Sequence, residues 1–330
     1  MTNVKILIIQ TAFIGDVVLA TPLVEKLNVH FPFSKIDILV RKGNESLFNE
    51  HPFLNEVLVF DKKKNKFLNF WKLLKKIRRK RYDYVINVQR FFTTGLLTAL
   101  SGAVETIGFK KNPLSIFFDY RVEHFISKDK TTHEVERNLK LIEDITDVSF
   151  ENPVLYPTKA DIESFSGTQP YICIAPASVW FTKQFPPHKW VELLNNLPAK
   201  YTIYLLGAKT DIALCEEIKS KTKNQKVEIL AGKISMTASM AVMQKAEMNY
   251  VNDSAPLHFA SAVNAPVTAI FCSTVPQFGF TPLSEKSFVI EKNPAPACRP
   301  CGLHGYRKCP KKHFQCADID VNEIIKQTLS

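Results

Sequence analysis

The chain has 330 residues, of which 45% are hydrophobic and 23% are charged, a balance that excludes a disordered or fibrous protein. No run approaches the roughly 18 to 20 apolar residues of a membrane span, and no secretory signal is recognisable, so we expect a cytoplasmic protein of two domains. The formal net charge is +11, which favours binding to anionic partners.

A strand, a loop and a helix are predicted at the start of the chain. The apolar run Ile6–Ile9 suits a strand buried on both faces, and the loop Thr11–Gly15 then leads to Asp16 at a helix start. In open parallel sheets, ligands bind at this carboxyl edge, beside helix N-termini that favour phosphate. An N-cap is the competing interpretation of Asp16. A single glycine, Gly15, falls short of the pattern of classical NAD-binding proteins.

The positive charge is concentrated in one segment, residues 62–81. This segment contains eleven Lys and Arg residues and no Asp or Glu, so the rest of the chain carries no net charge. Apolar residues recur in it at helical spacing, which predicts a basic amphipathic helix over Lys62–Arg81. The residues expected on its apolar face are Phe67, Phe70, Trp71, Leu74 and Ile77.

Strand-like and helical segments alternate along both halves of the chain, which predicts parallel sheets. One long helix is expected at His133–Asp147, and the proline-punctuated stretch Asn152–Pro170 is expected to join the halves. We predict the α/β class, with two doubly wound Rossmann-like domains, 1–165 and 166–330, facing a central cleft. The expected strands are Val4–Ile9, Ile36–Val40, Glu56–Phe60, Tyr84–Val88, Thr106–Phe109, Tyr171–Ala175, Tyr201–Leu206, Val227–Leu230, Met248–Val251 and Val267–Phe271.

A second strand, loop and helix are predicted within Val251–Phe271. Asp253, Ser254 and Ala255 stand on the turn that opens this helix. Pro256 fits the first helical position, because proline needs no N–H partner there. The second half therefore repeats the arrangement around Asp16.

Five segments carry a resemblance to a known family. In chain order they are QTAFIGDVVLATPL, WFTKQFPPHKW, YLLGAKTD, LAGKISM and NDSAPLHFASAVNAPVTAIF, across most of residues 4–290. Together they resemble the lipopolysaccharide heptosyltransferases, glycosyltransferase family 9. The resemblance implies a GT-B architecture and an inverting transfer of heptose from ADP-heptose to an inner-core acceptor of lipopolysaccharide. It implies that the first domain binds the acceptor and the second, with its Cys-rich tail and terminal helix, binds ADP-heptose.

The resemblance also implies roles for single residues. Asp16 matches the general base of the family, and Lys183 matches the lysine that contacts the ADP phosphates. Without the resemblance, Lys183 reads as a solvated loop lysine. Asp253 is expected to hold the sugar, and the backbone of Ser254 and Ala255 the diphosphate.

Four further residues are expected to support donor binding. Thr11 can add a hydroxyl to the phosphates, and His258 has a supporting role, with core packing as its competing interpretation. Gly207 and Gly232 end strands where the backbone can approach the nucleotide, although a tight turn alone would also select glycine.

The chain departs from the family pattern at two places. Relatives commonly carry Gly where this chain has Ala255, which leaves the phosphate geometry at this turn open. Asp318 and Asp320 resemble the metal-binding Asp-x-Asp of other glycosyltransferases, but they stand at the start of the terminal helix, where we interpret them as capping residues. No cofactor or metal is expected in catalysis.

The tail contains four cysteines at C-x2-C-x7-C-x6-C spacing, with two histidines between them. Four thiolates suit one structural zinc or iron ion, and paired disulfides or free thiols are the alternatives. We favour metal because the other cysteines are scattered through apolar segments, as in a reduced cytoplasmic protein. The tail residues are Cys298, Cys301, Cys309 and Cys316, with His304 and His313.

We expect the basic helix to seat the enzyme on the anionic inner face of the cytoplasmic membrane, because the implied acceptor is lipid-linked. A solvated helix packed on the sheet is the alternative. Two other functions compete with a transferase: a sugar-nucleotide epimerase of GT-B architecture, and a non-enzymatic polyanion or nucleic-acid binder. The aromatic residues of the basic segment are expected on one helical face and form no interleaved base-stacking pattern, so no nucleic acid is expected.

Overall fold

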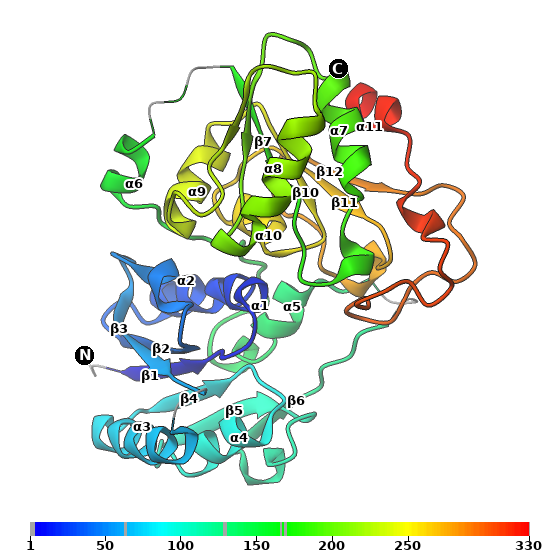
Figure 1. Ribbon diagram of the computed structural model, residues 1–330. Helices are drawn as coiled ribbons and strands as arrows, with labels where there is room; N and C mark the ends of the chain where they lie inside the picture. The colour runs from blue at the N-terminus through cyan, green and yellow to red at the C-terminus, as the bar shows by residue number, and fades with distance from the viewer. Residues whose placement is uncertain (1–3, 63–64, 128–130, 166, 168–169, 330) are drawn as a thin grey trace. The chain divides into compact units, whose positions relative to one another are not determined.

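The computed structural model describes residues 4–62, 65–127, 131–165, 167 and 170–329 (Figure 1). Contacts divide the chain into two compact units. Unit 1 is Met1–Ile126 with Thr132–Tyr156, and unit 2 is Ser127–Thr131 with Pro157–Ser330. The division at residue 156 precedes the predicted boundary at residue 165, because a short helix, α6 (Lys159–Glu163), already belongs to unit 2.

Unit 1 contains a six-stranded parallel sheet in the order β3-β2-β1-β4-β5-β6. Figure 1 shows α1, α2 and α5 on one face of this sheet and α3 and α4 on the other. The strands are β1 (Lys5–Ile9), β2 (Lys35–Arg41), β3 (Leu54–Phe60), β4 (Tyr84–Asn87), β5 (Glu105–Phe109) and β6 (Tyr120–Val122). The helices are α1 (Ile14–Val18), α2 (Thr21–His30), α3 (Lys66–Lys80), α4 (Phe92–Ala99) and α5 (Glu134–Leu139).

Unit 2 repeats this topology with the order β12-β11-β10-β7-β8-β9, again all parallel. The strands are β7 (Tyr171–Ala175), β8 (Thr202–Leu205), β9 (Val227–Ile229), β10 (Met248–Asn252), β11 (Val267–Phe271) and β12 (Ser287–Glu291). Besides α6, the helices are α7 (Pro187–Asn196), α8 (Ile212–Lys221), α9 (Met236–Gln244), α10 (Ala255–Ala262) and α11 (Val321–Thr328).

The predicted α/β class and the doubly wound order of both units are confirmed. The central strands are continuous apolar runs because helices cover both of their faces. Ile6, Leu7, Ile8 and Ile9 of β1 are all fully buried. The edge strands β6 and β12 were missed, because β6 has only three residues and neither is an uninterrupted apolar run.

The long helix predicted at His133–Asp147 is wrong. The capping box of His133 and Glu136 starts α5, which ends at Leu139, and a 3-10 turn follows at Glu143–Ile145. Leu141 and Ile142 are buried all the same. The apolar pattern therefore does not distinguish one long helix from a short helix followed by turns.

The basic helix is confirmed as α3, but its apolar face is only partly as predicted. Phe70, Leu74 and Ile77 are buried, together with Leu73, which the prediction missed. Phe67 and Trp71, which the prediction placed on this face, are instead 82% and 58% exposed. Lys63 and Lys64 lie outside the described residues.

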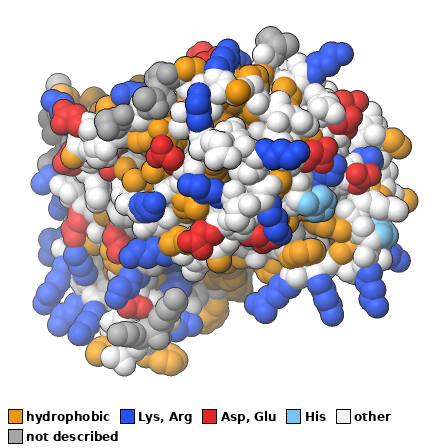
Figure 2. All heavy atoms as spheres, turned by 45° about the horizontal axis from the view of Figure 1, so that its top comes forward, with side chains coloured by type: hydrophobic (Ala, Val, Ile, Leu, Met, Phe, Trp, Pro, Cys, Tyr) orange, Lys and Arg blue, Asp and Glu red, His pale blue; other side chains and the backbone are white. Residues whose placement is uncertain are grey.

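Acidic side chains of neighbouring strands partly neutralise the positive charge of α3. Lys76 and Lys80 both pair with Glu56 of β3, and Lys80 pairs with Asp37 of β2. These acids come from neighbouring strands, so the sequence segment itself gives no sign of them. Figure 2 shows one face of the molecule, on which Lys and Arg side chains lie between hydrophobic ones. Among the described residues, no helix is long and apolar enough to cross a membrane.

The interpretation as residues that cap the terminal helix is confirmed for Asp320 but not for Asp318, which pairs with Lys292 at 3.4 Å. Asp320 is the N-cap of α11, and its carboxylate accepts a hydrogen bond of 2.9 Å from the backbone N–H of Asn322.

Candidate active site

Each sheet has a point where the strand order reverses, and the residues expected in catalysis or donor binding follow the strands at these points. In unit 1 the reversal lies between β1 and β4, and Asp16 follows β1. In unit 2 it lies between β7 and β10. Lys183 follows β7, and Asp253 follows β10 directly. Ligands of open parallel sheets bind at such points, beyond the carboxyl ends of the strands.

Asp16 lies in the first turn of α1, partly exposed. The N-cap of this helix is Phe13, so the competing interpretation of Asp16 as the N-cap is wrong. An acidic side chain in the first turn of a helix interacts favourably with the helix dipole.

Thr11 is buried just before this helix. Lys62 donates from Nζ to the Thr11 carbonyl oxygen at 2.9 Å and to its hydroxyl oxygen at 3.0 Å. The Thr11 hydroxyl is therefore already engaged within unit 1.

A cation ends or closely follows each of four strands around Asp16. Arg41 is the last residue of β2, and Lys62 follows β3. Arg90 follows β4, and Lys111 follows β5. None of the four makes an ion pair with a carboxylate of the residues that the structure describes. The carboxyl edge of the unit 1 sheet is therefore basic on both sides of Asp16.

The pKa values of two of these lysines are lowered, mainly by burial. Burial lowers the pKa of the Lys62 ammonium, and the charges of Arg41 and Lys66 lower it further. The Lys111 side chain is exposed, yet surrounding protein atoms lower its pKa to about 8, against the opposing effect of Glu134 and with the help of Arg90. Burial is the main cause of both shifts, and neighbouring cations lower both pKa values further.

We did not predict Arg41, Arg90 or Lys111 as site residues. The available signal was their position, since each ends or closely follows a predicted strand. Parallel strands bring such positions to one edge, which the linear pattern alone does not reveal.

Lys183 and Asp253 form an ion pair in unit 2, with Nζ and Oδ2 2.8 Å apart. Their side chains are 15% and 6% exposed. Thr274, from the loop after β11, donates its hydroxyl to the same Oδ2 at 2.5 Å. The lysine is therefore a partly buried cation held by a buried carboxylate, and not the solvated loop lysine of the competing interpretation.

The loop of Lys183 is fixed to the end of β10. The side-chain oxygen of Asn252 accepts from the backbone N–H of Phe185 at 2.8 Å, and its amide donates to the carbonyl oxygen of Pro176 at 2.8 Å. Ser254 is the N-cap of α10 and Ala255 is the first residue of this helix. The free N–H groups of this helix start thus lie in the same loop region as Asp253.

The other predicted donor residues are placed as follows. Gly207 and Gly232 are joined by a hydrogen bond of 2.9 Å from the Gly232 N–H to the Gly207 carbonyl oxygen. Gly232 has φ +70°, and a Cβ there would lie 2.9 Å from Cα of Lys209. The turn alone therefore requires glycine at 232. His258 is buried within α10.

The tail cysteines are all unbridged. Cys298, Cys301 and Cys309 are partly exposed and Cys316 is buried. The Cys298 sulfur lies 3.8 Å from Nε2 of His313. In the parts of the chain that the structure describes, no three His, Cys, Asp or Glu side chains are grouped to hold a metal ion. The predicted four-cysteine metal site is therefore not supported.

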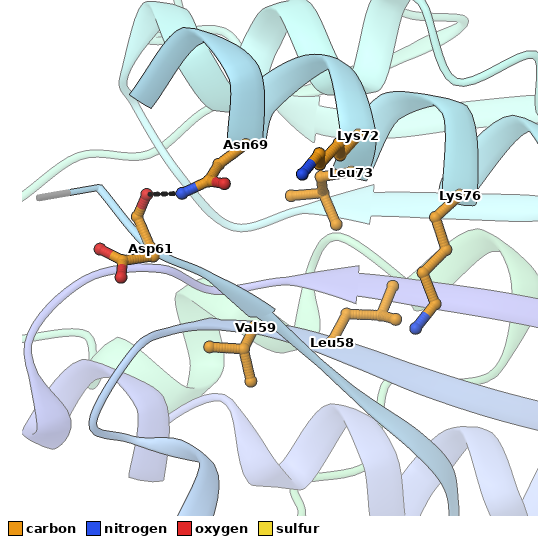
Figure 3. A pocket seen from close by; sticks show the side chains of 7 residues that line it. All are labelled: Leu58, Val59, Asp61, Asn69, Lys72, Leu73 and Lys76. Atoms are coloured by element: carbon orange, nitrogen blue, oxygen red, sulfur yellow. Dashed lines mark hydrogen bonds between the residues drawn. The ribbon is translucent and has the colours of Figure 1, made fainter. Parts of the chain in front are cut away.

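A groove of about 370 Å³ lies elsewhere in unit 1, between β3 and α3 (Figure 3). Asn69 crosses one end of it and donates to the carbonyl oxygen of Asp61 at 3.3 Å. None of the predicted site residues lines this groove. Its lining residues are Leu58, Val59, Asp61, Asn69, Lys72, Leu73 and Lys76.

Known proteins resemble this chain over most of its length. The sequence model of glycosyltransferase family 9 (heptosyltransferase) matches residues 70–303. Lipopolysaccharide heptosyltransferase 3 of Escherichia coli is 26% identical over 284 residues, which cover 79% of this chain and 82% of that protein.

Two solved structures from E. coli have the same fold. ADP-heptose lps heptosyltransferase II has a TM-score of 0.76 at 22% identity and covers 99% of this chain and 100% of its own. Heptosyltransferase WaaC with ADP-2-deoxy-2-fluoro heptose has a TM-score of 0.74 at 20% identity and covers 98% and 99%. The predicted GT-B fold is thereby confirmed.

Proposed function

This chain belongs to glycosyltransferase family 9 and is a glycosyltransferase, and on that premise we propose that it transfers heptose from ADP-heptose to a lipopolysaccharide core acceptor. The Lys183–Asp253 pair carries the proposal, because it places a partly buried ammonium at the point of unit 2 where a sheet of this topology binds phosphate. The relative bound to an ADP-heptose analogue supports this choice of donor.

The proposed reaction inverts the configuration of the transferred sugar. Asp16 takes the proton from the acceptor hydroxyl as that oxygen attacks the anomeric carbon and the bond to ADP breaks. Lys183 compensates the charge that develops on the departing diphosphate, and the N–H groups at the start of α10 add to this stabilisation. Asp253 holds Lys183 before the donor binds and contacts the sugar afterwards.

Unit 1 is proposed to bind the acceptor. The cations at the strand ends around Asp16 support this assignment, because core sugars that carry phosphate or carboxylate groups would find cations there that make no ion pair with a described carboxylate. Arg41 and Arg90 can each bind such a group through two parallel hydrogen bonds.

We also propose that α3 seats the enzyme on the inner face of the cytoplasmic membrane. Phe67 and Trp71 are exposed at the first two turns of the helix, and basic side chains follow them. Amphipathic aromatic and basic side chains together suit the boundary between lipid headgroups and acyl chains. Lys72, Lys75 and Arg79 supply charge that no described carboxylate neutralises.

A structural zinc or iron ion at the tail cysteines stays a prediction that rests on their number and spacing alone, since the described residues show no group that could hold it. Elemental analysis of protein purified without added metal tests it, with about one ion per chain as the expected result. Metal-free protein with reduced thiols would refute it.

Incubation with ADP-heptose, with and without a lipid-linked core acceptor, tests the proposed function. A transferase releases ADP only when the acceptor is present. An epimerase changes ADP-heptose without acceptor, and a polyanion binder does neither. The Asp16→Asn variant serves as the inactive control, since it keeps the shape of the side chain and removes its charge.

A further inference from the structure

The tail segment, which we define as residues 298–316, contacts the loops that carry the candidate donor residues of unit 2. The backbone of Tyr306 exchanges two hydrogen bonds with Thr182: its N–H donates to the Thr182 hydroxyl oxygen at 2.7 Å, and its carbonyl oxygen accepts from the Thr182 N–H at 3.1 Å. Thr182 is fully buried and directly precedes Lys183. The tail segment thereby fixes the backbone from which Lys183 extends.

The same segment fixes the loop that holds Asp253. Arg299 is 2% exposed and donates from Nε to the carbonyl oxygen of Thr274 at 2.9 Å. Its Nη2 donates to the carbonyl oxygen of Phe271 at 3.2 Å and pairs with Glu291 at 2.8 Å. The guanidinium thus closes the turn after β11, and Thr274 on that turn donates to Asp253.

Ser273 links the two loops. Its hydroxyl donates to the Thr182 hydroxyl oxygen at 3.0 Å, and its carbonyl oxygen accepts from the N–H of Cys301 at 2.9 Å. Ser273 and Thr182 are both fully buried. A displacement of the tail segment would therefore move the supports of both Lys183 and Asp253.

Gly305 marks the closest approach of the tail segment to the lysine. A Cβ at this position would lie 2.9 Å from the Thr182 hydroxyl oxygen and 3.0 Å from Cγ of Lys183. The Thr182 hydroxyl is held by two hydrogen bonds, so it cannot move aside without breaking them. Only glycine leaves Lys183 in its observed place.

We propose that Arg299 and Gly305 are positioning residues, through which the tail segment, by way of Thr182 and Ser273, holds Lys183 in the geometry that binds the donor diphosphate. The inference rests on the proposed donor site of unit 2. It gives the tail a role that does not depend on whether its cysteines bind a metal. The role is distinct from a purely structural one, because it predicts a change in donor affinity and not only in stability.

Two glycines of the tail segment provide a matched pair of variants. Gly302 and Gly305 have φ of +69° and +74°, so alanine strains the backbone similarly at both. A Cβ at Gly302 would meet nothing closer than the Tyr306 hydroxyl oxygen at 3.5 Å, which is ordinary contact. Only Gly305→Ala presses on Thr182 and Lys183.

The experiment compares the ADP dissociation constant of wild type, Gly302→Ala and Gly305→Ala by calorimetry, with thermal unfolding measured in parallel. We expect both variants to lose stability, Gly305→Ala more than Gly302→Ala because of its buried contacts, but only Gly305→Ala to bind ADP about tenfold more weakly, the loss typical of a displaced charge-assisted hydrogen bond. The KM for ADP-heptose should rise by a similar factor, with the KM for the acceptor unchanged.

Arg299→Met gives a second, independent variant, with Ile324→Ala in α11 as a control that destabilises the same unit away from the donor residues. Weaker ADP binding in Arg299→Met but not in Ile324→Ala supports positioning. If wild type binds ADP and the two variants Gly302→Ala and Gly305→Ala bind it with equal affinity, the inference is overturned. A wild type that does not bind ADP overturns the proposed function instead.

Discussion

Replacing Asp253 by asparagine is expected to tighten the binding of ADP, although it removes a carboxylate of the proposed donor site. In the structure, the Asp253 carboxylate forms an ion pair with the ammonium of Lys183, with Oδ2 and Nζ 2.8 Å apart. A diphosphate that binds this ammonium must displace the carboxylate or share the lysine with it. The asparagine side chain of the variant keeps the shape and the hydrogen bond from Thr274 but carries no charge, so the lysine becomes available.

The magnitude follows from the distance between the two anions. A carboxylate and a phosphate that share one ammonium lie about 5 Å apart, which corresponds to roughly 3 kcal/mol of repulsion at an effective dielectric constant of about 20. Water that enters with the ligand reduces this value, so we expect about 1 to 2 kcal/mol, or roughly five- to thirtyfold tighter ADP binding. Lys183→Met should have the opposite effect, of similar size, because a charge-assisted hydrogen bond is lost.

Calorimetry with ADP and with AMP measures both effects. AMP lacks the second phosphate, so its affinity should change less in both variants. ADP-heptose should gain less than ADP from Asp253→Asn, since the proposed contact to the sugar is weakened. Unchanged or weaker ADP binding in Asp253→Asn would refute the reasoning, because the carboxylate would then not compete for Lys183.

Three further predictions concern unit 1. Asp16→Asn should lower kcat by roughly 10²- to 10⁴-fold and leave the ADP dissociation constant unchanged; near-normal turnover would exclude a general base here. Burial raises the pKa of Glu25 to about 7. Between about pH 4.5 and 7, the folded state therefore keeps a proton that the unfolded state has released. The free energy of unfolding of wild type should decrease as the pH rises through this range. At pH 8 the free energy of unfolding of Glu25→Gln should thus exceed that of wild type by roughly 2 kcal/mol, a value reduced for solvent screening. At pH 4 the two proteins should be equally stable. Urea unfolding measures both, and a difference that does not depend on pH would contradict this prediction. Replacing three unpaired cations of α3 by Gln should lower the affinity for anionic vesicles about a hundredfold, at roughly 1 kcal/mol for each charge, as measured by co-sedimentation. Replacing Lys76, which pairs with Glu56, should lower this affinity less. Unchanged co-sedimentation of the triple variant would make α3 purely structural. The three cations are Lys72, Lys75 and Arg79.

Strand cores and the two strand–loop–helix units were predictable from the sequence, because their signals are local. Ile6–Ile9 and the other central strands are unbroken apolar runs, as strands covered on both faces require. Asp16 and Asp253 were found because each follows such a run at a turn into a helix. The family resemblance then supplied the role of Lys183, which spacing alone does not distinguish from a loop lysine.

The side-chain contacts between segments far apart in the sequence were decided by the tertiary structure. The ion pair of Lys183 and Asp253 spans seventy positions of sequence and exists because β7 and β10 are neighbours in the sheet. The acids that neutralise part of α3, and the tail segment that contacts the donor loops, likewise come from elements far away along the chain. Local patterns determine which residues enter a strand or helix, since burial and backbone geometry act within a few residues. The partners of a side chain depend on strand order and packing, which arise only when the whole unit folds.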